Sequence, residues 1–488
     1  MSPPFRRILV ANRGEIAVRV IRTARSMGIE AVAAYSDADS RALHVLMADY
    51  AVRLGGPEPS DSYLSVEAVV RAARDVGAEA VHPGYGFLAQ SAELAERLEE
   101  EGIAFIGPPA RVQRLVGDKL GARRFFRSAG VPVVPGTLEP VDPRDAPSVA
   151  EELGYPVMVK PAAGGGGIGM SIAWSEADLL EALRRAGDLA RKAFGRGEVY
   201  LEKYLPKARH VEVQVLGDGR GGVLHLYERE CSVQRRFQKV VEEAPSPALD
   251  EELRERLLTL ALKAARACNY VNAGTFEFLY DPPSRELYLL EVNSRIQVEH
   301  PVTEMVTGID IVREQILIAA GEGVSFRQEE VELRGHAMEA RVYAEDPAAG
   351  FAPSSGRITA YREPSGPFTR VDSGYYEGAE VPIYYDPLIM KVICWGSTRE
   401  EARRRLIAAL EETVIEGVKT NLAFLHLILN DPAFASGDYN TRIVEERGLA
   451  ERAASYSHRR LKLPRRRVEK KPAAPGVDAW RVASRMGL

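Results

Sequence analysis

The chain has 488 residues, of which 45% are apolar and 27% charged, and its formal net charge at pH 7 is −5. Because domains average roughly 150 residues, this length predicts about three of them, and the composition is that of a globular protein. The small net charge argues against nucleic acid and against an anionic membrane as partners.

The first predicted unit is residues 1–117, in which short apolar strands alternate with amphipathic helices. Repeated βα units of this length predict a parallel, Rossmann-like sheet. The first turn, Asn12-Arg13-Gly14-Glu15, contains a single glycine. Because a dinucleotide fingerprint needs GxGxxG at this turn, we do not expect a dinucleotide site.

Two further units and a tail follow. Residues 118–325 contain a smaller part at about 131–205, in which strands flank a glycine-rich segment, and end in longer strands that include the hairpin GTFEFLYDPPSRELYLLEVNSR. Residues 336–445 combine strands and helices. Residues 450–488 are crowded with Arg and Lys, which predicts a flexible or partner-dependent basic tail.

The glycine-rich segment follows the strand that ends at Lys160. Five of the six residues 164–169 are glycines, so no side chains prevent the backbone N–H groups from closing over a phosphate. A Walker A loop would end in Gly-Lys-Ser/Thr, whereas here the lysine precedes the glycines. The pattern indicates a lid over a polyphosphate, and a flexible linker is the alternative.

Carboxylates interrupt the apolar strands of the predicted hairpin. Glu277 lies between two phenylalanines and faces away from them, while Glu291 and Asn293 share one face because they are two residues apart. Carboxylates in such strands are costly unless they are paired or bind a metal. Oxygen ligands of this kind suit Mg²⁺ bound to nucleotide phosphates.

Polar residues follow directly at Arg295, Gln297 and Glu299. An arginine can hold a planar oxyanion, and a nearby carboxylate can accept its proton. A simple ion pair between the two is the alternative.

At this point the sequence closely resembles the biotin carboxylase family and, more widely, the ATP-grasp ligases. The resemblance covers about residues 1–445 and is carried by ANRGEIA at 11–17, HPGYGFL at 82–88, GDK at 117–119, GGGG at 164–167, EKYL at 202–205, RHVEVQVL at 209–216, ERECSVQRR at 228–236, EVNSRIQVEHPVTE at 291–304, HAMEARVYAEDP at 336–347 and EGVKTN at 416–421. It implies a multidomain α/β and α+β fold with a Rossmann-like N-terminal domain, an ATP-grasp fold with a glycine-rich lid, and a C-terminal biotin carboxylase domain.

The implied activity is that of an ATP-dependent carbon–nitrogen ligase. Bicarbonate attacks the γ-phosphate of ATP to give carboxyphosphate, which breaks down to CO₂ and phosphate, and the CO₂ is captured by biotin. The resemblance implies ATP and Mg²⁺ (or Mn²⁺) as cofactors and biotin on a biotin carboxyl carrier protein as substrate. It also implies that the chain is a homodimer and that its partners include a carboxyltransferase. The final acceptor, acetyl-CoA, propionyl-CoA or pyruvate, stays open because that choice belongs to another polypeptide.

The resemblance also implies which residues form the site, by their matching positions in the family's motifs. The nucleotide would be bound by Lys119, Lys160, Gly165, Gly166, Gly167, Met170, Glu202, Lys203, Leu205, His210, Gln234, Glu277, Leu279 and Glu291. The metal would be held by Glu277, Glu291 and Asn293. Bicarbonate would be held by Lys239, Arg295, Gln297 and Val298; Glu299 would be its base, and Arg341 would stabilise the biotin enolate.

The scarcity of lysine supports these assignments, because only 12 of the 64 basic residues are lysines. Four of the 12 are Lys119, Lys160, Lys203 and Lys239, and an ammonium is not equivalent to the guanidinium that the chain uses elsewhere. Three positions depart from many relatives: Ile168 replaces a basic residue, Ala163 a glycine and Phe237 a histidine. Their effect on ATP affinity stays open.

Two other functions compete with this interpretation. Another type of ATP-grasp ligase is disfavoured by residues 336–445 with Arg341, and a non-catalytic ATP-binding protein with a regulatory role is disfavoured by the intact set Glu277, Glu291 and Glu299. No Ala-Met-Lys-Met-like biotinylation site follows the catalytic region, and we interpret Lys391 in DPLIMKVICWG as a lysine of a core strand. We therefore expect biotin to arrive on a separate carrier.

The cysteines and the apolar runs predict the compartment. Cys231, Cys268 and Cys394 have no spacing typical of a disulfide framework or a zinc site. The apolar run near the N-terminus is too short for a signal peptide, and no later run resembles a membrane span. We expect a protein of the reducing cytoplasm.

Overall fold

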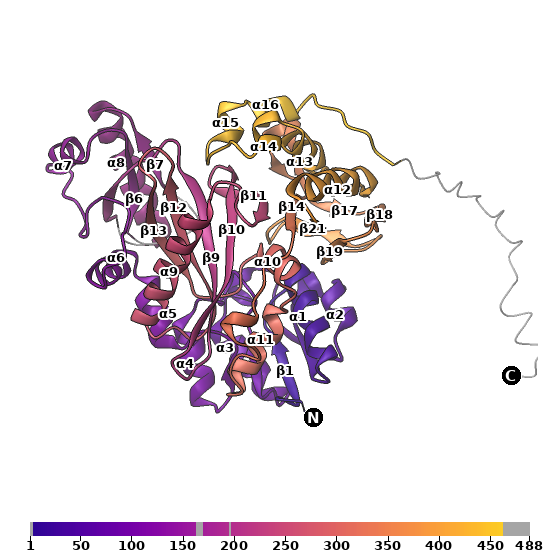
Figure 1. Cartoon of the computed structure of the whole chain (residues 1–488). Coiled ribbons are helices and arrows are strands. Elements are labelled where there is room, and N and C mark those ends of the chain that lie inside the picture. Colours follow the sequence, from indigo (N-terminus) through magenta and orange to yellow (C-terminus); the bar gives the residue numbers. More distant parts are fainter. Residues whose placement is uncertain (1–2, 163–168, 195–196, 462–488) are drawn as a thin grey trace, which may run out of the picture.

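The computed structural model describes residues 3–162, 169–194 and 197–461. Its first sheet is parallel, with the strand order β3-β2-β1-β4-β5, and confirms the predicted Rossmann-like unit (Figure 1). The strands are β1 (Arg7–Val10), β2 (Glu30–Ser36), β3 (Tyr50–Gly55), β4 (Ala80–His82) and β5 (Ala104–Phe105). Helices α1 (Gly14–Ser26), α2 (Leu43–Met47), α3 (Val66–Asp75), α4 (Ala92–Glu100) and α5 (Ala110–Gly117) alternate with them or follow the last strand.

Local sequence explains where several of these helices begin. Ser65 and Ser91 stand at the N-caps of α3 and α4, and each hydroxyl accepts a hydrogen bond from the backbone N–H three residues on. Such caps satisfy amide groups that have no partner within the helix. On α1 the buried residues include Ile16, Val20 and Ile21, which pack against the sheet.

A second, smaller sheet lies at the upper left of Figure 1 and has the antiparallel order β7-β6-β8. Its strands are β6 (Val157–Pro161), β7 (Ser171–Ala173) and β8 (Val199–Lys203), accompanied by α6 (Lys119–Ser128), α7 (Ala146–Leu153) and α8 (Glu176–Phe194). The predicted lid positions Gly165, Gly166 and Gly167, and the departures Ala163 and Ile168, lie outside the described residues.

The third sheet is the largest and has the order β13-β12-β9-β10-β11-β14-β21-β19. Its strands are β9 (Arg209–Gly217), β10 (Val223–Arg235), β11 (Gln238–Ala244), β12 (Asn272–Asp281), β13 (Glu286–Asn293), β14 (His336–Tyr343), β19 (Thr369–Ser373) and β21 (Leu388–Gly396). Antiparallel pairing of β11 with β14, Val241 opposite Ala340, makes the sheet continuous across the boundary predicted between residues 325 and 336.

Helices and short ladders cover this sheet. The helices are α9 (Glu251–Ala267), α10 (His300–Thr307), α11 (Ile311–Ala319), α12 (Arg399–Glu412), α13 (Leu422–Leu429), α14 (Pro432–Ser436), α15 (Ile443–Glu446) and α16 (Leu449–Ala453). The ladders pair β15 (Glu345–Asp346) with β16 (Ala352–Pro353), β17 (Gly356–Arg357) with β20 (Glu380–Val381), and β18 (Ala360–Arg362) with β22 (Val414–Glu416).

The first residues of the tail that was predicted to be flexible from residue 450 are packed against the fold. Residues 449–453 form α16, where Leu449 and Ala453 are buried in the C-terminal core, and Tyr456 packs against the same core. The N–H of Leu461 donates to the carbonyl of Glu411. Apolar contacts as far as Tyr456 and the backbone hydrogen bond of Leu461 therefore hold this segment to the fold, and the rest of the predicted tail lies outside the described residues.

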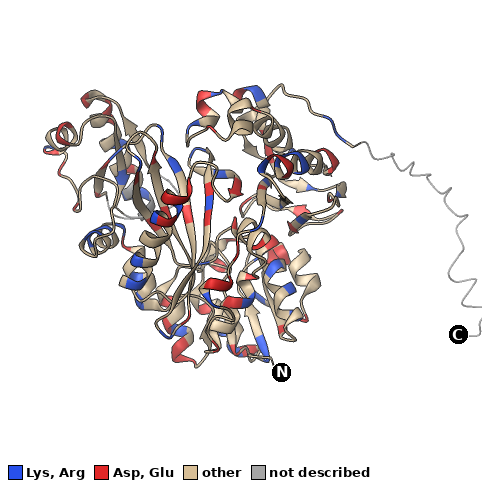
Figure 2. Cartoon of the chain, viewed as in Figure 1, with Lys and Arg blue, Asp and Glu red and all other residues tan. Residues whose placement is uncertain are grey.

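Acidic and basic residues are interspersed along the whole ribbon, as the small net charge predicts (Figure 2). Within the parts of the chain that the structure describes, no helix combines the length and the apolar character that crossing a bilayer requires.

Candidate active site

The candidate site lies on one face of the large sheet, where polar side chains alternate with core residues. On β9, Val211, Val213 and Val215 pack into the hydrophobic core, so His210 and Glu212 face the other side. In register, Arg229 on β10 lies opposite Glu212, Glu212 opposite Glu277, and Glu277 opposite Glu291. One row across four strands therefore contains an arginine and three carboxylates.

Lys239, at the start of β11, connects three of the buried carboxylates. Its Nζ lies 2.6 Å from Glu212 Oε2, 2.9 Å from Glu277 Oε1 and 2.6 Å from Glu299 Oε1. Burial alone would raise the pKa of the Glu212 and Glu277 carboxyls, but Lys239 and His210, with Arg229 at Glu212, together offset it and hold both below their usual value. Burial likewise opposes the charge on Lys239, and the carboxylates raise the pKa of its ammonium well above the usual value. The cluster is therefore ionised at neutral pH.

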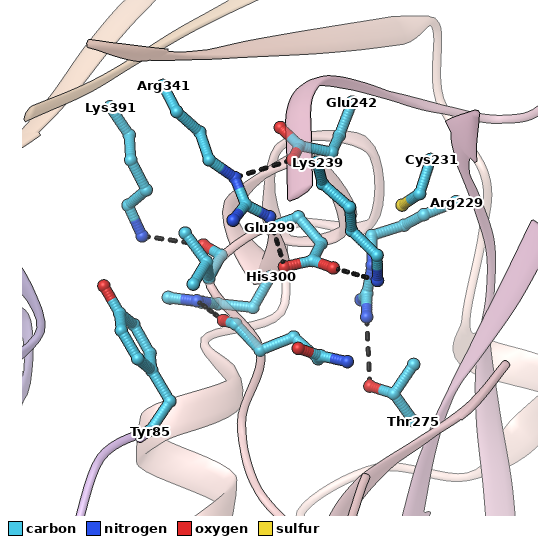
Figure 3. A network of polar contacts seen from close by, with 12 residues as sticks. Tyr85, Arg229, Cys231, Lys239, Glu242, Thr275, Glu299, His300, Arg341 and Lys391 are labelled. Carbon is cyan, nitrogen blue, oxygen red and sulfur yellow. Dashed lines mark hydrogen bonds and ion pairs between the residues drawn. The ribbon is translucent and has the colours of Figure 1, made fainter. Parts of the chain in front are cut away.

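Glu299 lies between two cations. The residue directly precedes α10. Its Oε1 accepts a hydrogen bond from Lys239, and its Oε2 accepts one of 2.9 Å from Nη2 of Arg341 on β14 (Figure 3). Burial would raise the pKa of the Glu299 carboxyl, yet Lys239, Arg341 and Arg229 hold it below its usual value. Glu299 is thus a carboxylate that can accept a proton beside two groups that attract anions.

The predicted metal ligands come together on β12 and β13. Nδ2 of Asn293 donates to Glu277 Oε1 at 2.9 Å and to Glu291 Oε1 at 3.3 Å, which holds the two carboxylates side by side. His210 Nε2 lies 3.1 Å from the other oxygen of Glu277. Two carboxylates and an amide form an oxygen-donor set that fits Mg²⁺ or Mn²⁺.

The loop after β13 carries the predicted bicarbonate residues. Nη1 of Arg295 donates to Gln297 Oε1 at 2.9 Å, and Gln297 Nε2 donates to Glu277 Oε1 at 2.7 Å. The carbonyl of Val298 accepts a bond of 2.8 Å from Lys391 Nζ. The described residues do not form the ion pair considered as the alternative for Arg295 and Glu299, because Glu299 contacts Lys239 and Arg341 instead.

The side chains of some predicted nucleotide residues lie near the carboxylate cluster, and those of others do not. Lys160 Nζ lies 2.5 Å from Glu202 Oε2, and Gln234 hydrogen-bonds His210, so these side chains adjoin the cluster or the lid. Lys119 is half-buried near Glu291, and its burial lowers the pKa of its ammonium. The ammonium of Lys203 instead bonds the backbone carbonyls of Gly154 and Tyr155. The remaining side chains of the set are half-buried, namely Met170, Leu205 and Leu279.

Several residues that support the site were missed by the sequence argument. Arg229 is fully buried and contacts Glu212, Gln214, Thr275 and Thr303. Lys391 was expected on a core strand and is completely buried there, but its ammonium also lies 3.1 Å from Glu15 Oε1. The alternation of RHVEVQV could have indicated Glu212, because the polar residues at every second position face away from the valines.

Three family models match successive parts of the chain. Residues 4–112 match the biotin carboxylase N-terminal domain, residues 118–326 the ATP binding domain of the carbamoyl-phosphate synthase L chain, and residues 339–446 the biotin carboxylase C-terminal domain. One pyruvate carboxylase subunit, from Methanothermobacter thermautotrophicus, is 50% identical over 443 residues, 91% of this chain and 90% of that protein. Biotin carboxylase 1 of Bacillus subtilis is 50% identical over 444 residues, 90% of this chain and 98% of that protein.

Solved structures agree with the sequence relatives. The biotin carboxylase domain dimer of Hydrogenobacter thermophilus 2-oxoglutarate carboxylase, in complex with MgADP, ADP and bicarbonate, is 48% identical with a TM-score of 0.89, covering 93% of this chain and 99% of that chain. Biotin carboxylase from Campylobacter jejuni is 43% identical with a TM-score of 0.88, covering 91% of this chain and 99% of that chain. By sequence and by fold, this chain belongs to the biotin carboxylase family.

Proposed function

We propose that this chain carboxylates biotin in a reaction that consumes ATP and bicarbonate and passes through carboxyphosphate. The observation that carries the proposal is Glu299, a buried ionised carboxylate held between Lys239 and Arg341. Lys239 is assigned to bicarbonate and Arg341 to biotin, so the base lies where the two halves of the reaction meet.

In the first half, Lys239 and Arg295, with Gln297 and the backbone of Val298, bind bicarbonate. The Lys239 ammonium is 2.6 Å from Glu299, so an anion bound to it lies within reach of that carboxylate. Glu299 takes the bicarbonate proton, the freed oxygen attacks the γ-phosphorus of ATP, and ADP leaves with the electron pair of the broken bond. Carboxyphosphate is the product.

Neutralising the polyphosphate is the task of the nucleotide residues. Mg²⁺ or Mn²⁺ held by Glu277, Glu291 and Asn293 would supply charge neutralisation and orientation of the phosphates. Lys119, Lys160 and His210 would contact the phosphates, and Glu202, Leu205 and the backbone of Lys203 would line the rest of the pocket. Burial opposes charge on His210, but Glu277 raises the pKa of its imidazole to about 9, so it is a cation at neutral pH.

In the second half, carboxyphosphate breaks to CO₂ and phosphate next to biotin. Phosphate takes the ureido proton, and the nitrogen of the resulting enolate attacks CO₂ to form carboxybiotin. Arg341 stabilises the negative enolate oxygen, because a fixed guanidinium in a buried site is effective where charge develops.

We further propose how the protein is assembled. Relatives include components of biotin-dependent carboxylases, such as the Methanothermobacter pyruvate carboxylase, which supports a separate biotin carrier and a carboxyltransferase as partners. The domain dimer of the Hydrogenobacter relative supports a homodimer, and three buried free cysteines suit a reducing cytoplasm. The reaction would then be carried out jointly by the predicted units 1–117, 118–325 with its lid, and 336–445.

The proposal is tested by measuring ATP cleavage in bicarbonate-depleted buffer, after adding bicarbonate, and after adding free biotin as well. We expect cleavage to require bicarbonate and labelled carbonate to enter carboxybiotin. Bicarbonate-dependent cleavage without carboxybiotin, at saturating biotin, would indicate another ATP-grasp ligase. ATP binding without bicarbonate-dependent cleavage would indicate a regulatory protein.

A further inference from the structure

Two buried glutamates behind Arg341 have no place in the mechanism above. Glu242 on β11 and Glu339 on β14 are completely buried and stand opposite each other in the ladder that joins the two halves of the large sheet. None of their four carboxyl oxygens has a hydrogen-bond partner within the described parts of the chain. Because an unpaired buried carboxylate is strongly disfavoured, each group is either neutral or paired with a cation.

Glu242 has such a cation beside it. Its Oε1 lies 2.6 Å from Nε of Arg341. Because the N–H group does not point at this oxygen well enough for a hydrogen bond, the contact is an ion pair. Nη2 of the same guanidinium donates to Glu299 at 2.9 Å. Figure 3 shows the guanidinium between these two carboxylates. With Nε and Nη2 held, the orientation of the planar group is fixed.

We propose that Glu242 is a positioning residue, whose carboxylate fixes the Arg341 guanidinium in the orientation that the biotin step requires. The inference rests on the proposed role of Arg341 in that step. Glu242 itself touches neither biotin nor the reacting atoms; it acts through Arg341.

The charges that face the pair from each packed element decide which glutamate is ionised. Glu242 faces Arg341 on β14, Glu299 before α10 and Lys239 on its own strand. Burial and the negative charge of Glu299 outweigh the two cations and raise the pKa of the Glu242 carboxyl to about 7. Glu339 faces Lys391 on β21, Glu242, Arg341 and Glu299, and burial raises the pKa of its carboxyl well above the usual value. Glu339 is therefore neutral at pH 7, while Glu242 changes charge near that pH.

This difference gives a matched pair of variants. Glu242→Gln removes a charge that holds Arg341, whereas Glu339→Gln makes the same chemical change at a carboxyl that is already neutral. The two positions are equally buried and adjacent in one ladder, so the general effect of placing an amide there is shared.

The experiment measures carboxybiotin formed per ATP cleaved, with free biotin and bicarbonate, from pH 6 to 8.5, for the wild type and both variants. In the wild type this ratio should fall as the pH drops through about 7, because Glu242 becomes neutral. In Glu242→Gln the ratio should be low and independent of pH. The loss at pH 8 should be about 10- to 10²-fold, the usual effect of a misplaced catalytic group, and should lie in kcat rather than in KM for biotin. Glu339→Gln should retain the wild-type ratio and pH dependence.

Three results would overturn the inference: a wild-type ratio in Glu242→Gln, equal losses in the two glutamine variants, or a loss confined to KM. If Glu242→Gln does not fold, as judged by its thermal melting, the absence of a pH dependence in the wild type would still overturn it. Failure of the proposed function looks different, because the wild type would then form no carboxybiotin at any pH.

Discussion

Replacing Lys239 by Met tests whether this ammonium holds the site together. The change retains most of the side-chain volume and removes the charge that lies within 2.6–2.9 Å of Glu212, Glu277 and Glu299. Burial would raise the pKa of these carboxyls, and Lys239 is the first of the groups that lower it. Without it, the least costly response is for one of the three carboxyls to take up a proton.

The size of the effect follows from that proton. Protonating a carboxyl of usual pKa of about 4.3 at pH 7 costs about 3.7 kcal/mol, which agrees with the roughly 3–5 kcal/mol found when one partner of a buried ion pair is removed. The cost should fall by about 1.4 kcal/mol for each unit toward pH 5, because the proton becomes easier to take up. The deficit in the free energy of unfolding is therefore about 4 kcal/mol at pH 7 and about 1 kcal/mol at pH 5.

The assay is urea unfolding of the metal-free protein, in EDTA, at pH 5, 6, 7 and 8, with linear extrapolation to zero urea. Lys263→Met is the matched control, since that exposed ammonium donates to the carbonyl of Gly130 and forms no ion pair within the described residues, and it should change the free energy of unfolding by less than about 0.5 kcal/mol. A deficit for Lys239→Met below about 1 kcal/mol at pH 7, or one that does not change with pH, would refute the reasoning.

Three further variants test separate parts of the structure. His82 is completely buried, and burial lowers the pKa of its imidazole to about 3. The stability that it contributes is present above the unfolded pKa of about 6.5 and is lost as the pH falls. His82→Asn, which keeps an acceptor for the Gly84 N–H, should therefore reduce the pH dependence of the unfolding free energy between pH 6 and 5 by about 1.4 kcal/mol per pH unit. Glu291→Gln should raise the Mg²⁺ concentration for half-maximal ATP cleavage at least about tenfold. It should change the melting temperature little, because the Glu291 side chain is exposed. An unchanged Mg²⁺ requirement would show that Glu291 is not part of the metal site. Phe237 is 42% exposed and lies in a turn at φ +67°, a backbone conformation that histidine tolerates better. Phe237→His should therefore leave the KM for ATP unchanged or lower it. A large increase in KM would show that the phenylalanine ring supports the nucleotide pocket.

Local patterns in the sequence were sufficient to predict which carboxylates of the candidate site face one another. Glu277 between two core phenylalanines, and Glu291 two residues before Asn293, gave the facing carboxylates because side chains alternate along a strand. The βα repeats likewise predicted the parallel N-terminal sheet, whose order places the first strand at its centre. These features depend on periodicity within a few residues.

What the sequence did not predict depends on partners far apart in the chain. The pairing of β11 with β14 joins residues near 241 to residues near 340 and brings Glu242 and Arg341 into contact. Lys391 looks like an isolated core lysine until Glu15, from the first helix, is placed beside it. The packing of residues 450–461 was hidden because a basic composition predicts flexibility while a few apolar side chains determine the contact.

The most direct test of the two-stage mechanism compares the products formed by Glu299→Gln and Arg341→Ala. Glu299→Gln keeps the shape and removes the base, so bicarbonate-dependent ATP cleavage should fall about 10²- to 10⁴-fold, and carboxybiotin should fall with it. Arg341→Ala should retain much of the bicarbonate-dependent cleavage and lose most carboxybiotin, since we propose that the guanidinium acts in the second half of the reaction. Equal loss of ATP cleavage in both variants, with melting temperature and ATP binding intact, would contradict the two-stage assignment and place Arg341 with the bicarbonate residues.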